Sequence, residues 1–194
     1  MPLAAFIAKS LGKRIGKAVD ESTKIEGGLT AYLSEVIRGV GAGNAHVHHR
    51  DGLEGLIAMT PPNPNRGAVL IDPPYERFEE YADVTRTVTK LFRRWQNAQV
   101  VLWYPLLSAR AGKKSGASEN MVDDLKDIAK TAFVAELHVA SPDDDTGMYG
   151  SGVLVMNPPW QLDEQLRDAL DEVCSHLGAD SHASVTWLKQ EADD

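Results

Sequence analysis

The chain has 194 residues, of which 43% are hydrophobic, and a formal net charge of −8. This length and composition suffice for one buried core, so a single domain spanning residues 1–194 is expected. The acidic balance excludes a protein that is one broad nucleic-acid-binding surface, and the single cysteine excludes an internal disulfide and a thiolate metal cluster. No apolar run reaches the roughly 18 to 20 residues of a membrane span, so a soluble cytoplasmic protein without a membrane partner is expected.

The first third of the chain predicts two amphipathic helices around a short strand. Residues 2–15 and 29–37 carry apolar side chains at helical spacing, and a strand ending near Glu26 lies between them. The glycine-rich segment 39–43 follows a helix, whereas a nucleotide-binding glycine turn follows a strand and opens a helix. A helix end and a loop are therefore expected at 39–43.

A second strand is predicted by the alternation of apolar and polar residues at 45–48. His46 and His48 would share one face of this strand, but no third ligand lies nearby in the sequence, so no metal site is expected. Asp51-Gly52 would lie at the carboxyl end of the strand, and a short helix would follow around residues 53–57.

Residues 67–76 combine a fold signal with a chemical one. The apolar run 68–71 predicts a short buried strand, and Asp72-Pro73-Pro74-Tyr75 follows directly. Ligands of open α/β sheets bind at the carboxyl ends of the strands. The two prolines fix the backbone and remove two donors, so the segment is a rigid turn rich in hydrogen-bond acceptors, with an aromatic ring at its end.

The remaining elements alternate regularly and predict an α/β sheet. Helices are expected at 79–96, 119–132 and 161–177, and strands at 100–104, 133–140, 153–156 and 183–188. Pro105 is expected to stop the strand that precedes it, and the small-residue segment 147–152 is expected to be a connection.

A second proline turn, Asn157-Pro158-Pro159-Trp160, also ends an apolar strand. An amide oxygen accepts hydrogen bonds as a carboxylate does, and tryptophan stacks as well as tyrosine. For either turn, the functional interpretation competes with a simpler one, in which prolines end a strand and an aromatic side chain packs beside it. Residue types alone leave this choice open.

Asp72-Pro73-Pro74-Tyr75 resembles the catalytic signature of amino-group adenine methyltransferases, which use S-adenosylmethionine on a Rossmann-like sheet. The wider pattern over residues 51–188 resembles the RlmJ family, whose enzymes methylate N6 of one adenine in large-subunit ribosomal RNA. In order along the chain, the segments that carry this resemblance are 66–76, Leu102-Trp103-Tyr104-Pro105, 147–152 leading into Asn157-Pro158-Pro159-Trp160, and 182–187. The resemblance implies a class I methyltransferase fold, with a mostly parallel sheet and antiparallel C-terminal strands.

The same resemblance implies roles for individual residues. Asp72 and the Pro73 carbonyl would accept the two hydrogens of the adenine amino group, and Tyr75 would stack on the extruded base. Asp51 and Gly52 match a cofactor-binding pair, and Glu26 falls where the family places a carboxylate for the ribose of S-adenosylmethionine. The second proline turn matches a segment outside the catalytic motif.

Residues 2–5 resemble a segment well inside the family's enzymes, so the first strand and its glycine turn are expected to be absent from this chain. The expected function is methylation of ribosomal RNA, with S-adenosylmethionine as cofactor and ribosomal RNA as partner. One alternative is a non-catalytic domain that binds RNA or a protein. Another is a DNA adenine methyltransferase, which shares only the four-residue signature.

Overall fold

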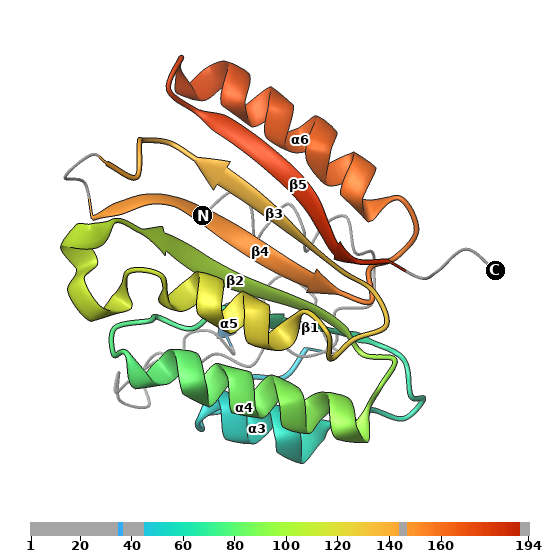
Figure 1. Cartoon of the computed structure of the whole chain (residues 1–194). Coiled ribbons are helices and arrows are strands. Elements are labelled where there is room, and N and C mark those ends of the chain that lie inside the picture. Colours follow the sequence, from blue (N-terminus) through green and yellow to red (C-terminus); the bar gives the residue numbers. More distant parts are fainter. Residues whose placement is uncertain (1–34, 37–44, 144–146, 191–194) are drawn as a thin grey trace.

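The computed structural model describes residues 35–36, 45–143 and 147–190. In this part of the chain, helices flank a five-stranded sheet (Figure 1). The elements in chain order are α3 (Gly52–Met59), β1 (Ala68–Ile71), α4 (Glu79–Arg94), β2 (Gln99–Leu107), the 3-10 helix η1 (Ala109–Lys114), α5 (Ala117–Leu125), β3 (Ala132–His138), β4 (Met148–Met156), α6 (Leu162–Leu177) and β5 (His182–Lys189).

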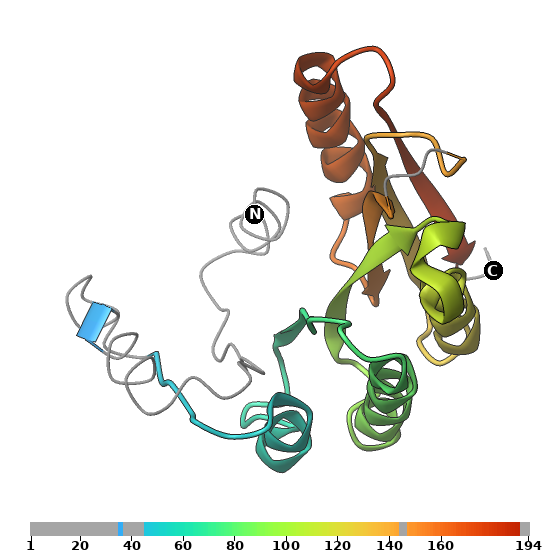
Figure 2. The ribbon, with the colours of Figure 1, turned by 90° about the vertical axis from the view of Figure 1, so that its left-hand side faces the viewer.

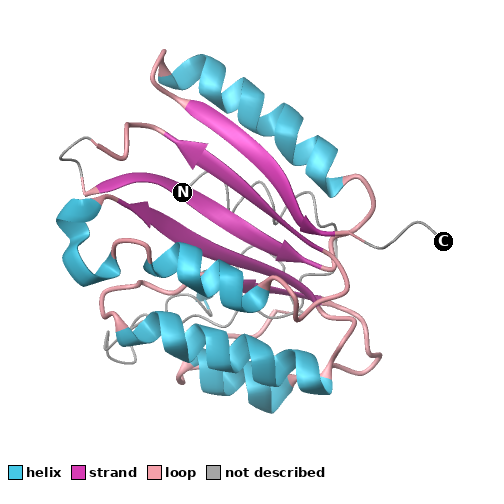
Figure 3. Ribbon diagram, viewed as in Figure 1, coloured by secondary structure: helices cyan, strands magenta, loops and turns pink. Residues whose placement is uncertain are grey.

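Several expected features lie outside the described residues. These are the helix at 2–15, the strand that ends near Glu26, Glu26 itself, and the glycine-rich segment 39–43. Of the helix expected at 29–37, only residues 35–36 are described, and they are helical. The prediction of one domain over residues 1–194 therefore stays a prediction, although the described residues share one sheet (Figure 3).

The strand order is β1-β2-β4-β3-β5. β1 pairs with β2 in parallel, whereas β4 is antiparallel to both β2 and β3, and β5 is antiparallel to β3. β1, β2 and β3 therefore share one direction, and the C-terminal strands β4 and β5 run against it, as expected. The expectation of a mostly parallel sheet is wrong for the pairing in the described residues, because β4 is inserted between β2 and β3.

The helices form two layers on opposite faces of the sheet. α4 and α5 cover one face, α6 covers the other, and α3 packs beside α4 (Figure 2). Successive side chains of a strand enter the two cores in turn. Leu102 and Tyr104 of β2 lie in the core on the α4 side, and Val101 lies in the core under α6. This alternation follows from the two-residue period of a strand. The fold is the class I methyltransferase fold that was expected, and the expected absence of its first strand stays a prediction.

α4 illustrates why these segments fold as they do. Its apolar residues recur at helical spacing and are buried against the sheet, while acidic residues begin the helix and Arg93 and Arg94 end it, which favours the helix dipole. The buried side chains on this face are those expected from the sequence, namely Tyr81, Val84, Val88, Leu91, Phe92 and Trp95. Fully burying one such side chain contributes roughly 1.5–3 kcal/mol. The helix predicted at 79–96 is thus confirmed.

Four predictions about elements or their bounds are wrong. The helix expected at 119–132 ends at Leu125, where a turn begins in which the Ile128 amide donates to the Leu125 carbonyl. The strand predicted at 45–48 does not form, since none of the described strands pairs with these residues, and Asp51-Gly52 therefore follows a loop and not a strand. β2 continues through Pro105 to Leu107, because β1 pairs only with Gln99–Leu102. Beyond Leu102, β4 is the single neighbour of β2 among the described strands, and a proline is tolerated there. Residues 148–152 belong to β4, whose two glycines allow close approach of neighbouring groups.

Candidate active site

The turn Asp72-Pro73-Pro74-Tyr75 follows β1 directly, so the prediction that Asp72 lies at the carboxyl end of a strand is confirmed. Asp72 and Pro74 are exposed, whereas Pro73 and Tyr75 are buried. The turn therefore presents a carboxylate to the surface while two of its residues anchor it in the core. Tyr75 has a φ of 48°, a left-handed conformation that non-glycine residues rarely adopt and that contacts of the surrounding structure must hold.

Tyr75 is one of these anchors. Its side chain is only 3% exposed, and its ring lies 4.5 Å from the ring of Tyr81 between centroids. The hydroxyl donates a hydrogen bond to the carbonyl of Trp103 in β2, at 3.1 Å. Burial, reinforced by Tyr81 and Asp72, raises the pKa of the phenol far above its usual value, so it stays protonated and can donate.

The buried position of Tyr75 bears on its expected role. A ring that stacks on a base must offer an open face, and in this structure the ring is enclosed by protein. Stacking on an extruded adenine stays a prediction, and it requires the ring to leave its contacts with Tyr81 and Trp103.

Lys114 forms a second anchor that the sequence analysis did not identify. Its ammonium donates to the carbonyl of Tyr75 at 3.2 Å and to that of Glu76 at 3.4 Å. Lys114 ends η1, in a segment for which the sequence predicts neither a helix nor a strand, and no pattern in the sequence links it to a turn nearly forty residues earlier. The lysine thus holds the turn from its outer side while the Tyr75 hydroxyl holds it from the core.

Replacing Lys114 by methionine is expected to loosen this turn, because methionine keeps the aliphatic length but lacks the donor. Hydrogen exchange should then accelerate at the amides of residues 75–78, and Lys114→Arg should restore much of the protection. Lys113→Met is the matched control, since the neighbouring Lys113 is exposed and makes no hydrogen bond to a described residue. Unchanged exchange in Lys114→Met would show that the contact does not hold the turn.

Asp51 and Gly52 lie where α3 begins. The Asp51 carboxylate accepts a hydrogen bond from the amide of Glu54 at 2.7 Å, so it caps the helix. Asp51 is exposed and Gly52 is buried, so the carboxylate remains accessible to a ligand at a helix N-terminus. The third expected cofactor residue, Glu26, lies outside the described residues.

Asn157, in the second proline turn, has a structural role that is clear from its contacts. Its amide nitrogen donates to the carbonyls of Gln96 and Ala98, both at 2.9 Å, and its amide oxygen accepts from the backbone amide of Lys130 at 3.2 Å. The side chain therefore ties the end of β4 to the residues that precede β2 and β3. Its φ of 49° suits asparagine better than most residues.

Asn157→Ala is expected to lower the free energy of unfolding by about 1–3 kcal/mol. It removes the side-chain partner of three backbone groups, namely the carbonyls of Gln96 and Ala98, the latter in a buried residue, and the amide of Lys130. Denaturant unfolding would measure the change. Asn157→Gly removes the same hydrogen bonds but tolerates the positive φ, so the difference between the two variants isolates the backbone strain. An unchanged midpoint in Asn157→Ala would contradict the structural role.

The described part of the chain offers neither a metal-binding cluster nor a membrane span. No group of three or more histidine, cysteine, aspartate or glutamate side chains comes together there as a metal ion would require. None of the helices in those residues has the length and apolarity of a membrane span.

The fold and the turn at the end of β1 define this chain as a class I methyltransferase-type protein, and comparison with known proteins identifies its family. The family model described as "Ribosomal RNA large subunit methyltransferase D, RlmJ" matches residues 38–189, so the chain belongs to the RlmJ family. Curated relatives include "Ribosomal RNA large subunit methyltransferase J" of Escherichia coli, 34% identical over 150 residues, and that of Haemophilus influenzae, 30% identical over 152 residues.

Both alignments cover 76% of this chain, and they cover 51% and 52% of the two relatives. A crystal structure of a Legionella pneumophila protein is also similar, with a TM-score of 0.66 and 26% identity over 73% of this chain and 51% of that one. The chain thus spans about half the length of the relatives that it matches.

Proposed function

We propose that this chain carries the base-binding part of a methyltransferase that transfers a methyl group from S-adenosylmethionine to N6 of an adenine in large-subunit ribosomal RNA. The observation that carries the proposal is the position of Asp72-Pro73-Pro74-Tyr75, at the carboxyl end of β1 with the Asp72 carboxylate exposed. Membership of the RlmJ family supports the RNA substrate. A cytoplasmic location follows from a ribosomal substrate.

The proposed chemistry requires hydrogen-bond acceptors at an amino group. The lone pair of the adenine amino nitrogen is delocalised into the ring, which makes this nitrogen a poor nucleophile. Asp72 and the Pro73 carbonyl accept its two hydrogens, which favours a pyramidal nitrogen with its lone pair aimed out of the ring plane. Tyr75 stacks on the base once the base has left the RNA stack, provided the ring turns out of the core.

The residues at the start of α3 suit one end of the cofactor. S-adenosylmethionine, when bound, supplies the methyl group from a sulfonium centre. The exposed Asp51 carboxylate can accept a hydrogen bond from its ribose or adenine, and Gly52 permits close approach to the backbone at a helix N-terminus. Glu26 is the second carboxylate proposed for the ribose. We assign no described residue to the methionine end of the cofactor.

Calorimetry and a transfer assay test this proposal. Titration of the 194-residue chain with S-adenosylmethionine, with Asp51→Ala as the comparison, measures whether the chain holds the cofactor. Transfer of labelled methyl from the cofactor to an RNA hairpin and to a DNA hairpin of the same sequence then separates RNA from DNA methylation. Cofactor binding and transfer to RNA support the proposal. RNA binding without either would favour the non-catalytic alternative.

A further inference from the structure

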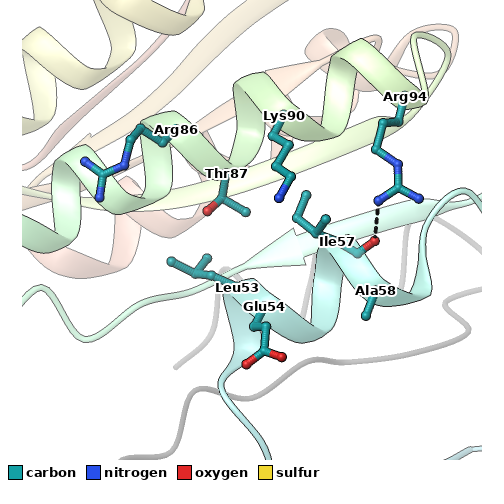
Figure 4. A pocket seen from close by; sticks show the side chains of 8 residues that line it. All are labelled: Leu53, Glu54, Ile57, Ala58, Arg86, Thr87, Lys90 and Arg94. Carbon is teal, nitrogen blue, oxygen red and sulfur yellow. Dashed lines mark hydrogen bonds between the residues drawn. The ribbon is translucent and has the colours of Figure 1, made fainter.

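A groove between α3 and α4 gathers positive charge in a chain that is acidic overall. Its volume is about 540 Å³, and Figure 4 shows side chains of both helices facing each other across it. α4 contributes three cations to one wall, and α3 contributes an apolar wall. We call this feature the α3–α4 groove and define it by Arg86, Lys90 and Arg94 from α4 and by Leu53, Ile57 and Ala58 from α3.

The positive charges of the groove are only partly balanced by carboxylates of the described residues. Arg86 pairs with Asp83, which precedes it by three residues in α4, so Lys90 and Arg94 carry the unpaired charge. Glu54 is the acidic residue of its lining, and this carboxylate is already paired with Arg50 at 2.9 Å. Arg94 donates to the carbonyl of Ile57 at 2.8 Å, which satisfies a carbonyl in the last turn of α3 and leaves the guanidinium charge in place (Figure 4). Lys90 extends toward α3, and among the described residues its ammonium contacts no acceptor.

The spacing of the cations matches an extended polyanion better than a single small anion. Arg86, Lys90 and Arg94 follow one another at intervals of four residues, so they form a row along one side of α4 with about 6 Å between successive positions. Across from this row, Leu53 and Ile57 are half-buried and provide apolar contact. A row of cations beside an apolar wall suits a nucleic-acid backbone, whose charged phosphates alternate with less polar sugars.

The groove is also connected to the candidate active site through the chain itself. α4 begins a few residues after the Asp72 turn, and the segment from β1 runs along the molecule into the first turn of α4 (Figure 1). α3 begins at the Asp51 cap. The two helices that form the groove therefore start next to the two segments proposed for base and cofactor binding.

We propose that the α3–α4 groove binds the phosphate backbone of RNA beside the nucleotide that enters the active site, an inference that rests on the proposed function. Lys90 and Arg86 contact phosphates through their charges, and the binding is independent of base sequence. Arg94 mainly holds α3 and α4 together through the Ile57 carbonyl.

A second hollow supplies a matched control for this proposal. It has a volume of about 450 Å³ and includes Arg93 and Lys130 in its lining, which shares no residue with the lining of the α3–α4 groove. The side chains of Arg93 and Lys130 are exposed and make no ion pair with a described residue. Arg93→Gln/Lys130→Gln therefore removes the same charge as Arg86→Gln/Lys90→Gln and acts at another place on the same protein.

The test measures binding of a fluorescent RNA hairpin with an unpaired adenine, by anisotropy at several salt concentrations. The groove double variant is expected to bind several-fold more weakly, with the slope of log K against log salt reduced by about 0.7 to 1 per lost contact. The control double variant should keep the wild-type affinity and slope. If the double variant folds poorly, Lys90→Gln alone can replace it, because this side chain is exposed. The single variant should give a smaller change of the same kind.

Equal weakening in both double variants would overturn the proposal, because it would show attraction to overall charge only. An unchanged affinity in the groove variant, or no RNA binding by the wild-type chain, would overturn it as well. An unchanged affinity in a groove variant that still transfers methyl overturns the groove proposal alone, whereas a wild-type chain that binds no RNA would overturn both proposals. The wild-type chain could bind RNA but transfer no methyl group, while the groove variant loses binding. The groove proposal would then hold and the catalytic proposal would fail.

Discussion

Asp72→Ala is expected to reduce methyl transfer by about 100- to 1,000-fold or more, the usual effect of removing a hydrogen-bonding group that acts at the reacting atom. The carboxylate is exposed at the end of β1 and contributes little to the core, so the fold should survive. Transfer would be measured with the 194-residue chain and with a chain extended to the length of its relatives, and thermal unfolding would check the fold.

Two controls sharpen this prediction. Asp72→Asn keeps one acceptor oxygen but places an N–H₂ group near the adenine amino group, so it should retain more activity than alanine and less than the wild type. Asp168→Ala removes an exposed carboxylate from α6, on the other face of the sheet, and should leave transfer unchanged. If Asp72→Ala transferred methyl as fast as Asp168→Ala, Asp72 could not be the acceptor.

Gly152→Ala is expected to give the second large effect, on stability. A Cβ at this position would lie 2.4 Å from the ring of Tyr104, which is fully buried and whose hydroxyl donates to Glu136 at 2.9 Å. The ring must shift to avoid the clash, which strains the core and disturbs that hydrogen bond. Overpacking of this kind costs about 1–3 kcal/mol, and denaturant unfolding would measure it.

A double-mutant cycle tests the cause of that loss. Tyr104→Leu removes the ring and should destabilise the chain by itself, because it leaves a cavity in the core. If the clash is the cause, Gly152→Ala should cost much less in the Tyr104→Leu background than in the wild type. Additive losses would mean that Gly152 matters for another reason, such as backbone freedom.

The parts of the fold that depend on local periodicity could be predicted from the sequence. α4 and α6 carry long amphipathic patterns, and the residues expected to be buried in α4 are buried. The errors concern features that depend on strand partners. Pro105 lies inside β2 because of where β1 stops pairing, and the residues at 45–48 alternate without forming a strand, since hydrogen-bonded neighbours and not alternation alone make a strand.

The candidate site shows the same difference between features that a local sequence pattern predicts and features that depend on distant parts of the chain. Asp72 could be placed because a carboxylate after a short apolar run must lie at the end of a strand. The contacts of Lys114 and of Asn157 join segments that are distant in the chain, so the sequence carries no local sign of them. Gly150 and Gly152 do carry a local sign, since glycines in a strand often mark close approach, although the small residues of 147–152 also predict a connection.

Nucleoside analysis of the methylated RNA tests the central claim most directly. After reaction with S-adenosylmethionine carrying a labelled methyl group, the RNA is digested to nucleosides and the labelled product is identified by mass spectrometry. The Asp72 site predicts N6-methyladenosine from the wild-type chain extended to the length of its relatives, and almost none from Asp72→Ala in the same extended chain. A label on a ring carbon, on a ribose or on another base, or no label at all, would contradict an amino-group site at Asp72.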